Sequence, residues 1–139
     1  MEHMTAVEYQ KTVSHPKTKY HNKKTVVDGM IFDSQKEADH YCELKIQKRT
    51  GEIIDFFQQV PLLVNEGYFN NGEWVQPVYY KADFVVIQYG YNFDVEDINK
   101  PIKYVKTEIH EVKGYWTKEA KIKWKIVVNR YPEYKFLVI

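Results

Sequence analysis

The sequence contains a single cysteine, Cys42, and no apolar run of the roughly 20 residues that a helix needs to cross a bilayer. One thiol excludes an internal disulfide framework and any zinc site built from several cysteines. The N-terminal segment is too polar for a signal peptide or membrane anchor. We therefore expect a cytoplasmic protein without a membrane partner.

A strong net charge is also missing, since 20 basic and 19 acidic side chains give a formal charge of +1. Composition alone thus gives no reason to expect binding to nucleic acid. Lysines nevertheless gather near both ends of the chain. Those that we predict to contact phosphates of nucleic acid are Lys23, Lys24, Lys121 and Lys125. A solvated surface explains the pair on the second predicted helix equally well.

The length of 139 residues and the 44% of hydrophobic residues suit one domain with an ordinary core. Residues 1–24 lack hydrophobic periodicity, which predicts a flexible basic arm before a single domain over residues 25–139. The predicted elements are two short strands in 25–32, a helix over about 34–49, strand material in 52–64 broken near Pro61, a loop at 65–72, a strand over 78–89, a polar connection at 90–101, a strand over 102–112, a helix over 117–130 and a strand over 134–139. This order predicts an α/β (α+β) fold with a mixed β-sheet flanked by helices.

Both predicted helices have recognisable ends. Ser34 followed by Glu37 forms a capping box, and Gly51 marks the end of the first helix. Thr117 is the expected N-cap of the second helix. Its predicted core positions are Ile122, Ile126 and Val127.

The tripeptide Glu111-Val112-Lys113 combines a hard oxygen ligand with a cation. Two residues apart on a strand, Glu111 and Lys113 face the same side, with their Cα atoms roughly 6–7 Å apart. The pattern also occurs at Glu43-Leu44-Lys45, Glu119-Ala120-Lys121 and Glu133-Tyr134-Lys135. Only the first of these four lies at the end of a predicted interior strand and runs into a glycine and a basic helix. The competing interpretation is an ion pair on the sheet, worth little at a surface.

Asp83 lies within a predicted strand, where aspartate is a poor strand former and is costly to bury without a partner. It could bond to Lys81 or to a backbone amide. If the two long strands are neighbours, Asp83 could instead lie near Glu111 and help to hold a divalent cation.

Glu37 can act as a capping residue or as a third acidic ligand. It shares one helical face with Tyr41 and Leu44 and so points partly inward. Lys36, His40, Glu43 and Gln47 form the predicted solvated face. The histidines show no metal-ligand spacing, and we assign none of them to catalysis.

Taken in order, seven motifs between residues 20 and 138 resemble one known family. They are Asn22-Lys23-Lys24-Thr25, the segment 28–38 (DGMIFDSQKEA), Gly51-Glu52-Ile53, Gln59-Val60-Pro61, Tyr80-Lys81-Ala82-Asp83-Phe84, Glu111-Val112-Lys113-Gly114, and a Thr-Lys-rich helix before Arg130-Tyr131-Pro132. This set resembles small phage and prophage proteins related to Holliday-junction resolvases, within the PD-(D/E)XK nuclease superfamily. The specificity lies in the ordered set, because each motif alone is weak.

The resemblance implies a restriction-endonuclease-like fold with a Mg²⁺ or Mn²⁺ site. By this resemblance Glu37, Asp83 and Glu111 are metal ligands, the Val112 carbonyl is a backbone ligand, and Lys113 orients the attacking water or stabilises developing charge. Ala82 replaces the proline that names the superfamily, but that residue is not a ligand. Between the aspartate and the Glu-x-Lys pair lie 27 residues, more than in many relatives, which suggests an insertion around residues 90–101.

The expected function is that of a divalent-metal-dependent endonuclease that hydrolyses DNA phosphodiester bonds, branched DNA included. The resemblance implies a phage or prophage origin, hence the cytoplasm of a bacterial host, and cleavage of two strands favours a homodimer. One alternative is a catalytically silent nucleic-acid-binding or phage interaction protein with the same fold. Another is a structural phage protein whose tyrosine-rich surface binds a second protein.

Overall fold

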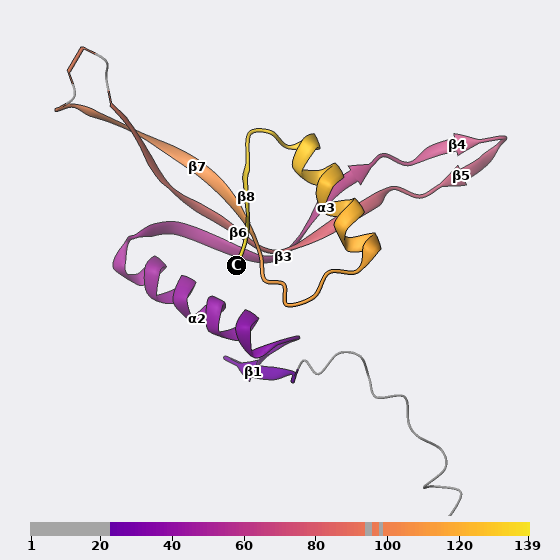
Figure 1. Ribbon diagram of the computed structural model, residues 1–139, viewed down its shortest axis with the longest axis horizontal. Helices are drawn as coiled ribbons and strands as arrows, with labels where there is room; N and C mark the ends of the chain where they lie inside the picture. The colour runs from indigo at the N-terminus through magenta and orange to yellow at the C-terminus, as the bar shows by residue number, and fades with distance from the viewer. Residues whose placement is uncertain (1–22, 94–95, 98) are drawn as a thin grey trace, which may run out of the picture. The chain divides into compact units, whose positions relative to one another are not determined.

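The computed structural model describes residues 23–93, 96–97 and 99–139 (Figure 1). The described chain divides into two units, one that ends at residue 35 and one that spans residues 36–139. In the first unit, β1 (Thr25–Val27) and β2 (Met30–Phe32) form an antiparallel hairpin. Asp28 and Gly29 both have positive φ at its turn, as the Asp-Gly signal predicted. Most of the predicted flexible arm falls outside the described residues, so its boundary at residue 24 stays a prediction.

The second unit contains a four-stranded sheet with the order β3-β6-β7-β8. Along the chain come α2 (Gln35–Thr50), β3 (Ile53–Asn65), β4 (Tyr68–Asn70), β5 (Glu73–Val75), β6 (Val78–Phe93), β7 (Pro101–Glu111), α3 (Lys118–Arg130) and β8 (Lys135–Val138). The β3–β6 and β6–β7 pairs are antiparallel, whereas β7 and β8 are parallel. The predicted mixed α+β fold, including the long hairpin of the two central strands, is therefore confirmed.

The helices cover the two faces of this sheet (Figure 1). On one face, the α2 ring of Tyr41 packs edge-on against Phe56 of β3, with ring centroids 5.8 Å apart. On the other face, Val127 of α3 is fully buried in the core. The buried residues that cluster with it are Leu62, Val64, Tyr80, Ala82 and Ile109. Each helix thus needs the sheet in order to bury its apolar stripe.

The alternation of side chains between the two faces of the sheet shifts by one residue part-way along β3. Phe56 faces α2, but Leu62, an even number of residues further on, belongs to the cluster with α3. In a regular strand both would face the same side. Between them, Gln59 has a left-handed φ of 52° and lies opposite Asp83, where the ladder of paired residues is interrupted. The irregularity therefore falls where the candidate site residues lie.

Three predictions about the strands were wrong in detail. The expected loop at 65–72 contains most of the β4–β5 hairpin, which turns at Asn71 and Gly72 with positive φ at both. The polar connection at 90–101 is shorter than predicted, because β6 and β7 remain paired as far as Phe93 and Pro101. Strand β3 is not broken at Pro61, because β3 lies at the sheet edge, where a missing N–H is tolerated.

The second helix begins as predicted, since the Thr117 side chain accepts a hydrogen bond of 3.0 Å from the Ala120 amide. Its core positions were partly wrong, because Ile122 and Ile126 are exposed and only Val127 is fully buried. The side that faces the sheet carries Trp124 instead. Within the part of the chain that the structure describes, no helix has the length and apolar character that a membrane crossing requires.

Candidate active site

Glu111 and Lys113 lie at the C-terminal end of β7 and form an ion pair of 2.7 Å between Glu111 Oε1 and Lys113 Nζ. Glu111 is only 1% exposed, and its second oxygen, Oε2, is buried as well. The buried Tyr80 hydroxyl lies beside the Glu111 carboxylate. Burial, and next the contact with the Glu111 carboxylate and its charge, raise the Tyr80 pKa, so this hydroxyl stays protonated. Burying a carboxylate this deeply is costly unless it is paired or coordinates a cation.

Asp83 of β6 reaches across to the chain just beyond β7. Its Oδ2 accepts a hydrogen bond of 2.9 Å from the Val112 amide, so the predicted bond to a backbone amide does form. Burial, and next the negative charge of Glu111, raise the pKa of Asp83 to about 7, although the Val112 hydrogen bond acts in the opposite direction. The charge of Glu37 adds to the increase. These neighbouring carboxylates therefore carry more negative charge than the protein around them compensates.

Glu37 of α2 joins these carboxylates through Gln59. The Glu37 side chain is 7% exposed, and its Oε1 accepts a hydrogen bond of 3.0 Å from Gln59 Nε2. The same Nε2 lies 3.5 Å from Asp83 Oδ1, a long contact. Sequence reasoning gave Gln59 no role, although it is part of a motif in the ordered set. A non-glycine residue held in a left-handed conformation within a strand is strained, and such residues gather at functional sites.

Lys113 is held as a cation by the carboxylates around it. Burial alone would lower its pKa, but the hydrogen bond to Glu111 and the charges of Glu111, Asp83 and Glu37 raise the pKa of Lys113. It therefore remains protonated at neutral pH. In this state it can orient a water or stabilise negative charge, but it cannot accept a proton.

The fit of a metal to this site depends on its oxygen atoms. Carboxylate oxygens and a backbone carbonyl are the ligands that Mg²⁺ prefers. Among the described residues, no three His, Cys, Asp or Glu side chains already converge on one point. The three carboxylates engage Gln59, the Val112 amide and Lys113 instead. Oε2 of Glu111 takes no part in the ion pair with Lys113 and is the candidate ligand atom, and binding by all three carboxylates would require side-chain rotations.

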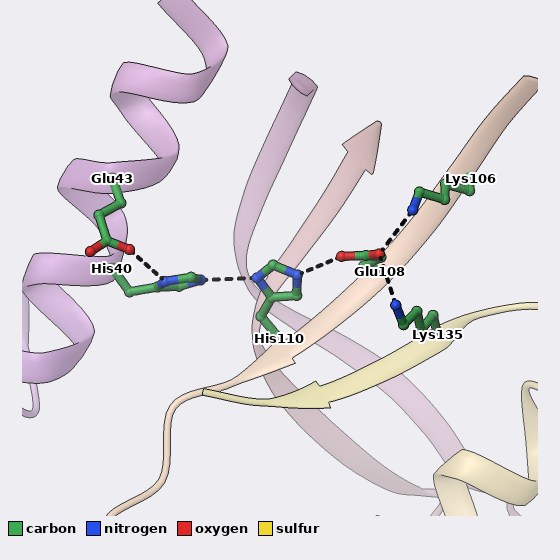
Figure 2. A network of polar contacts seen from close by, with 6 residues as sticks. All are labelled: His40, Glu43, Lys106, Glu108, His110 and Lys135. Atoms are coloured by element: carbon green, nitrogen blue, oxygen red, sulfur yellow. Dashed lines mark hydrogen bonds and ion pairs between the residues drawn. The ribbon is translucent and has the colours of Figure 1, made fainter. Parts of the chain in front are cut away.

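A buried chain of polar groups links α2 to β7 (Figure 2). His40 Nε2 lies 2.9 Å from His110 Nδ1, and His110 Nε2 lies 3.1 Å from Glu108 Oε2. The prediction that His40 lies on the solvated face was wrong, because it is only 8% exposed and packs edge-on against Phe84. His40 follows Glu37 by one helical turn, and His110 precedes Glu111. The pair thus joins the two elements that carry these glutamates.

The partners assign the tautomers of both histidines. Because His110 Nε2 faces the Glu108 carboxylate, it carries a proton, and Nδ1 of that tautomer accepts from His40 Nε2. The remaining His40 Nδ1 lies 3.5 Å from Glu43 Oε2. Burial, and next the proximity of His110, lower the pKa of His40, although Glu43 opposes this shift. His40 is therefore neutral at physiological pH.

A family model described as "Protein of unknown function (DUF1064)" matches residues 17–139. The chain belongs to this family. No curated protein and no solved structure gives a significant match to it.

The predicted nucleic-acid contacts of this DUF1064 chain fall into two groups. Lys121 and Lys125 of α3 line a pocket beside the end of β8. Lys23 and Lys24 are exposed residues of the first unit. Contact of either group with nucleic acid stays a prediction.

Proposed function

We propose that this protein is a divalent-metal-dependent endonuclease acting on DNA. The observation that carries the proposal is the proximity of three carboxylates: Gln59 links Glu37 to Asp83, and the charges of Glu111 and Glu37 both act on Asp83. The ordered motifs, which resemble those of PD-(D/E)XK nucleases related to Holliday-junction resolvases, support DNA as substrate. They also support branched DNA, a phage or prophage origin in a bacterial host, and a homodimer.

The roles of the side chains follow from their surroundings. Glu37, Asp83 and Glu111 would hold Mg²⁺ or Mn²⁺, with the Val112 carbonyl as a backbone ligand. The bound ion would supply polarisation of the scissile phosphate and an activated water. Protonated Lys113 would orient the attacking water or stabilise the charge that develops on the phosphate.

Gln59 would act as a positioning residue. Its amide donates to Glu37 and lies near Asp83, so it holds a helix carboxylate beside a strand carboxylate. The buried His40–His110 contact would add a second tie between α2 and β7. Both ties fix the ligand-bearing elements before an ion binds, which lowers the cost of assembling the site.

The test is cleavage of supercoiled plasmid and four-way junction DNA by the purified protein in Mg²⁺ or Mn²⁺. We expect metal-dependent products with 5′-phosphate ends that a DNA ligase can rejoin. Lys113→Ala should lower the cleavage rate by roughly 10²-fold or more, the scale for loss of a group that stabilises transition-state charge. Lys45→Ala, from another Glu-x-Lys tripeptide, is the matched control and should cleave like wild type. Equal cleavage by Lys113→Ala and wild type would show that the proposed site is wrong.

The rival is a nucleic-acid-binding or phage interaction protein that has the fold without turnover. The near-neutral net charge of +1 of this chain is as compatible with binding to another protein as with binding to DNA. Binding of DNA or of a protein partner without cleavage in either metal, together with no metal binding by calorimetry, would favour the rival.

A further inference from the structure

An open pocket of about 270 Å³ lies between the first turns of α3 and the end of β8. Its lining residues are Trp116, Lys121, Trp124, Lys125 and Val138. The lining thus combines two indole rings with two cations and contains no acidic side chain. Its volume falls just below the roughly 300 Å³ at which drug-sized ligand pockets begin, so it suits one planar ring system.

The aromatic wall of this pocket is preformed. The Trp124 ring makes edge-on contacts with three neighbours, whose centroids lie 5.4 Å away for Trp116, 5.8 Å for Tyr80 and 5.4 Å for Phe136. Such contacts hold the ring in one orientation. Trp116, in the segment that joins β7 to α3, is half-buried and keeps part of its surface open to a ligand.

The two lysines of the pocket carry positive charge that the described part of the chain leaves uncompensated. Lys121 and Lys125 are exposed, stand one helical turn apart, and form no ion pair with a described carboxylate. Lys123 between them differs, since it pairs with Glu119 at 3.1 Å. A ligand that matches the pocket therefore has a flat apolar ring and nearby negative charge, which is the chemistry of a nucleotide.

The pocket adjoins the candidate active site through Lys113. Lys113 Nζ lies 6.0 Å from the centroid of the Trp116 ring and 2.7 Å from Glu111 Oε1. A nucleotide chain passing the carboxylates would therefore meet Trp116 next. A paired base cannot use this ring, because both of its faces are covered by stacking, whereas an unpaired base can stack on it.

We propose that this pocket binds one unpaired nucleobase beside the scissile phosphate, and that Lys121 and Lys125 contact the phosphates next to that base. The inference rests on the proposed nuclease function and narrows its substrate class to DNA with an unpaired or displaced nucleotide, as at a branch point. Trp116 and Trp124 form the stacking surface.

The test measures binding in EDTA, so that its outcome does not depend on cleavage. The probes are a fully paired duplex and the same duplex with one extra, unpaired 2-aminopurine, and the readouts are the dissociation constant and the quenching of 2-aminopurine fluorescence. We expect wild type to prefer the bulged DNA and to quench the probe. Trp116→Ala should weaken binding to bulged DNA about tenfold, within the range for loss of one base–aromatic stack, and change duplex binding less than twofold. Trp116→Phe should retain most of the preference.

Trp74→Ala is the matched control, since Trp74 is a half-exposed tryptophan of β5 outside the pocket, and it should bind both probes like wild type. A second test avoids the aromatic core. Lys121→Ala combined with Lys125→Ala should reduce the slope of log affinity against log salt by about 1.5, whereas Lys123→Ala should leave that slope nearly unchanged.

Base binding in the pocket and cleavage at the carboxylates are measured separately. Equal weakening of both probes by Trp116→Ala, no weakening of either, or no preference for bulged DNA in wild type would overturn the pocket inference, even if metal-dependent cleavage is observed. The expected binding pattern without any cleavage in Mg²⁺ or Mn²⁺ would support the pocket as a nucleobase site and contradict the nuclease proposal.

Discussion

Asp83→Asn should stabilise the metal-free protein at alkaline pH while removing its response to metal. The pKa of Asp83 is raised from 3.8 to about 7, by burial and then by the charge of Glu111. Between about pH 4 and pH 7 the folded protein thus keeps a proton that the unfolded chain has released. The free energy of unfolding therefore falls as pH rises through that window, and the full destabilisation by the ionised Asp83 is present above pH 7.

The size of the penalty follows from the shift in pKa. Three pKa units at about 1.4 kcal/mol each give an upper limit of about 4 kcal/mol, and solvent screening at this partly exposed carboxyl reduces it to roughly 2 kcal/mol. Asparagine keeps an oxygen to accept the Val112 amide and carries no charge. We expect Asp83→Asn to match wild type near pH 4.5 and to exceed its free energy of unfolding by roughly 2 kcal/mol at pH 8, or about 8 °C in Tm.

The assay is urea and thermal denaturation in EDTA at both pH values, repeated with Mn²⁺. The difference between variant and wild type cancels the contributions of other titrating groups, such as the buried histidines. Mn²⁺ should stabilise wild type and leave the variant unchanged, because ligand binding to the folded state alone raises its stability. If the stability difference is the same at pH 4.5 and pH 8, or if the variant is less stable than wild type at pH 8, the ionised Asp83 does not destabilise the folded protein.

Two further predictions concern the residues that hold the site together. Gln59→Gly should be about 1 kcal/mol more stable than Gln59→Ala in urea denaturation, because glycine accepts the left-handed φ of 52°. Both variants should lose the same share of cleavage activity, because both lack the amide that bridges Glu37 and Asp83. A more stable alanine variant would contradict this prediction. His40→Leu should cost roughly 2 kcal/mol by leaving His110 Nδ1 without its hydrogen-bond partner. The lowered pKa of His40 makes wild type lose stability on acidification below pH 6.5, and the variant should show a smaller loss. Denaturation from pH 5 to pH 8 checks the second prediction, and an unaltered pH profile would count against it.

Local patterns predicted the elements of the fold better than its irregularities. Helical periodicity correctly placed Glu37, Tyr41 and Leu44 on the buried side of α2. The same reasoning put Ile122 and Ile126 in the core because isoleucine is strongly apolar. The sheet instead covers the side of α3 that carries Trp124. The apolar residue type alone did not indicate which side of the helix met the sheet.

Two features of the structure could not be predicted from the sequence, and a third could have been. The left-handed φ of Gln59 has no local signal, because glutamine shows no preference for that conformation. The contact of His40 with His110 joins residues that only the folded sheet brings together. The β4–β5 turn could have been predicted, since Asn71-Gly72 between aromatic residues is a strong hairpin signal of the same kind as Asp28-Gly29.

The proposed nuclease depends on the binding of one divalent cation by Glu37, Asp83 and Glu111 together. This binding can be measured by calorimetric titration of Mn²⁺ into wild type and into Glu37→Gln, Asp83→Asn and Glu111→Gln. Glu43→Gln, an exposed glutamate of the same helix as Glu37, is the control. We predict binding by wild type and by the control, with a large loss of affinity in each of the three site variants. If wild type does not bind Mn²⁺, or if binding survives each of the three substitutions, these carboxylates do not form a metal site.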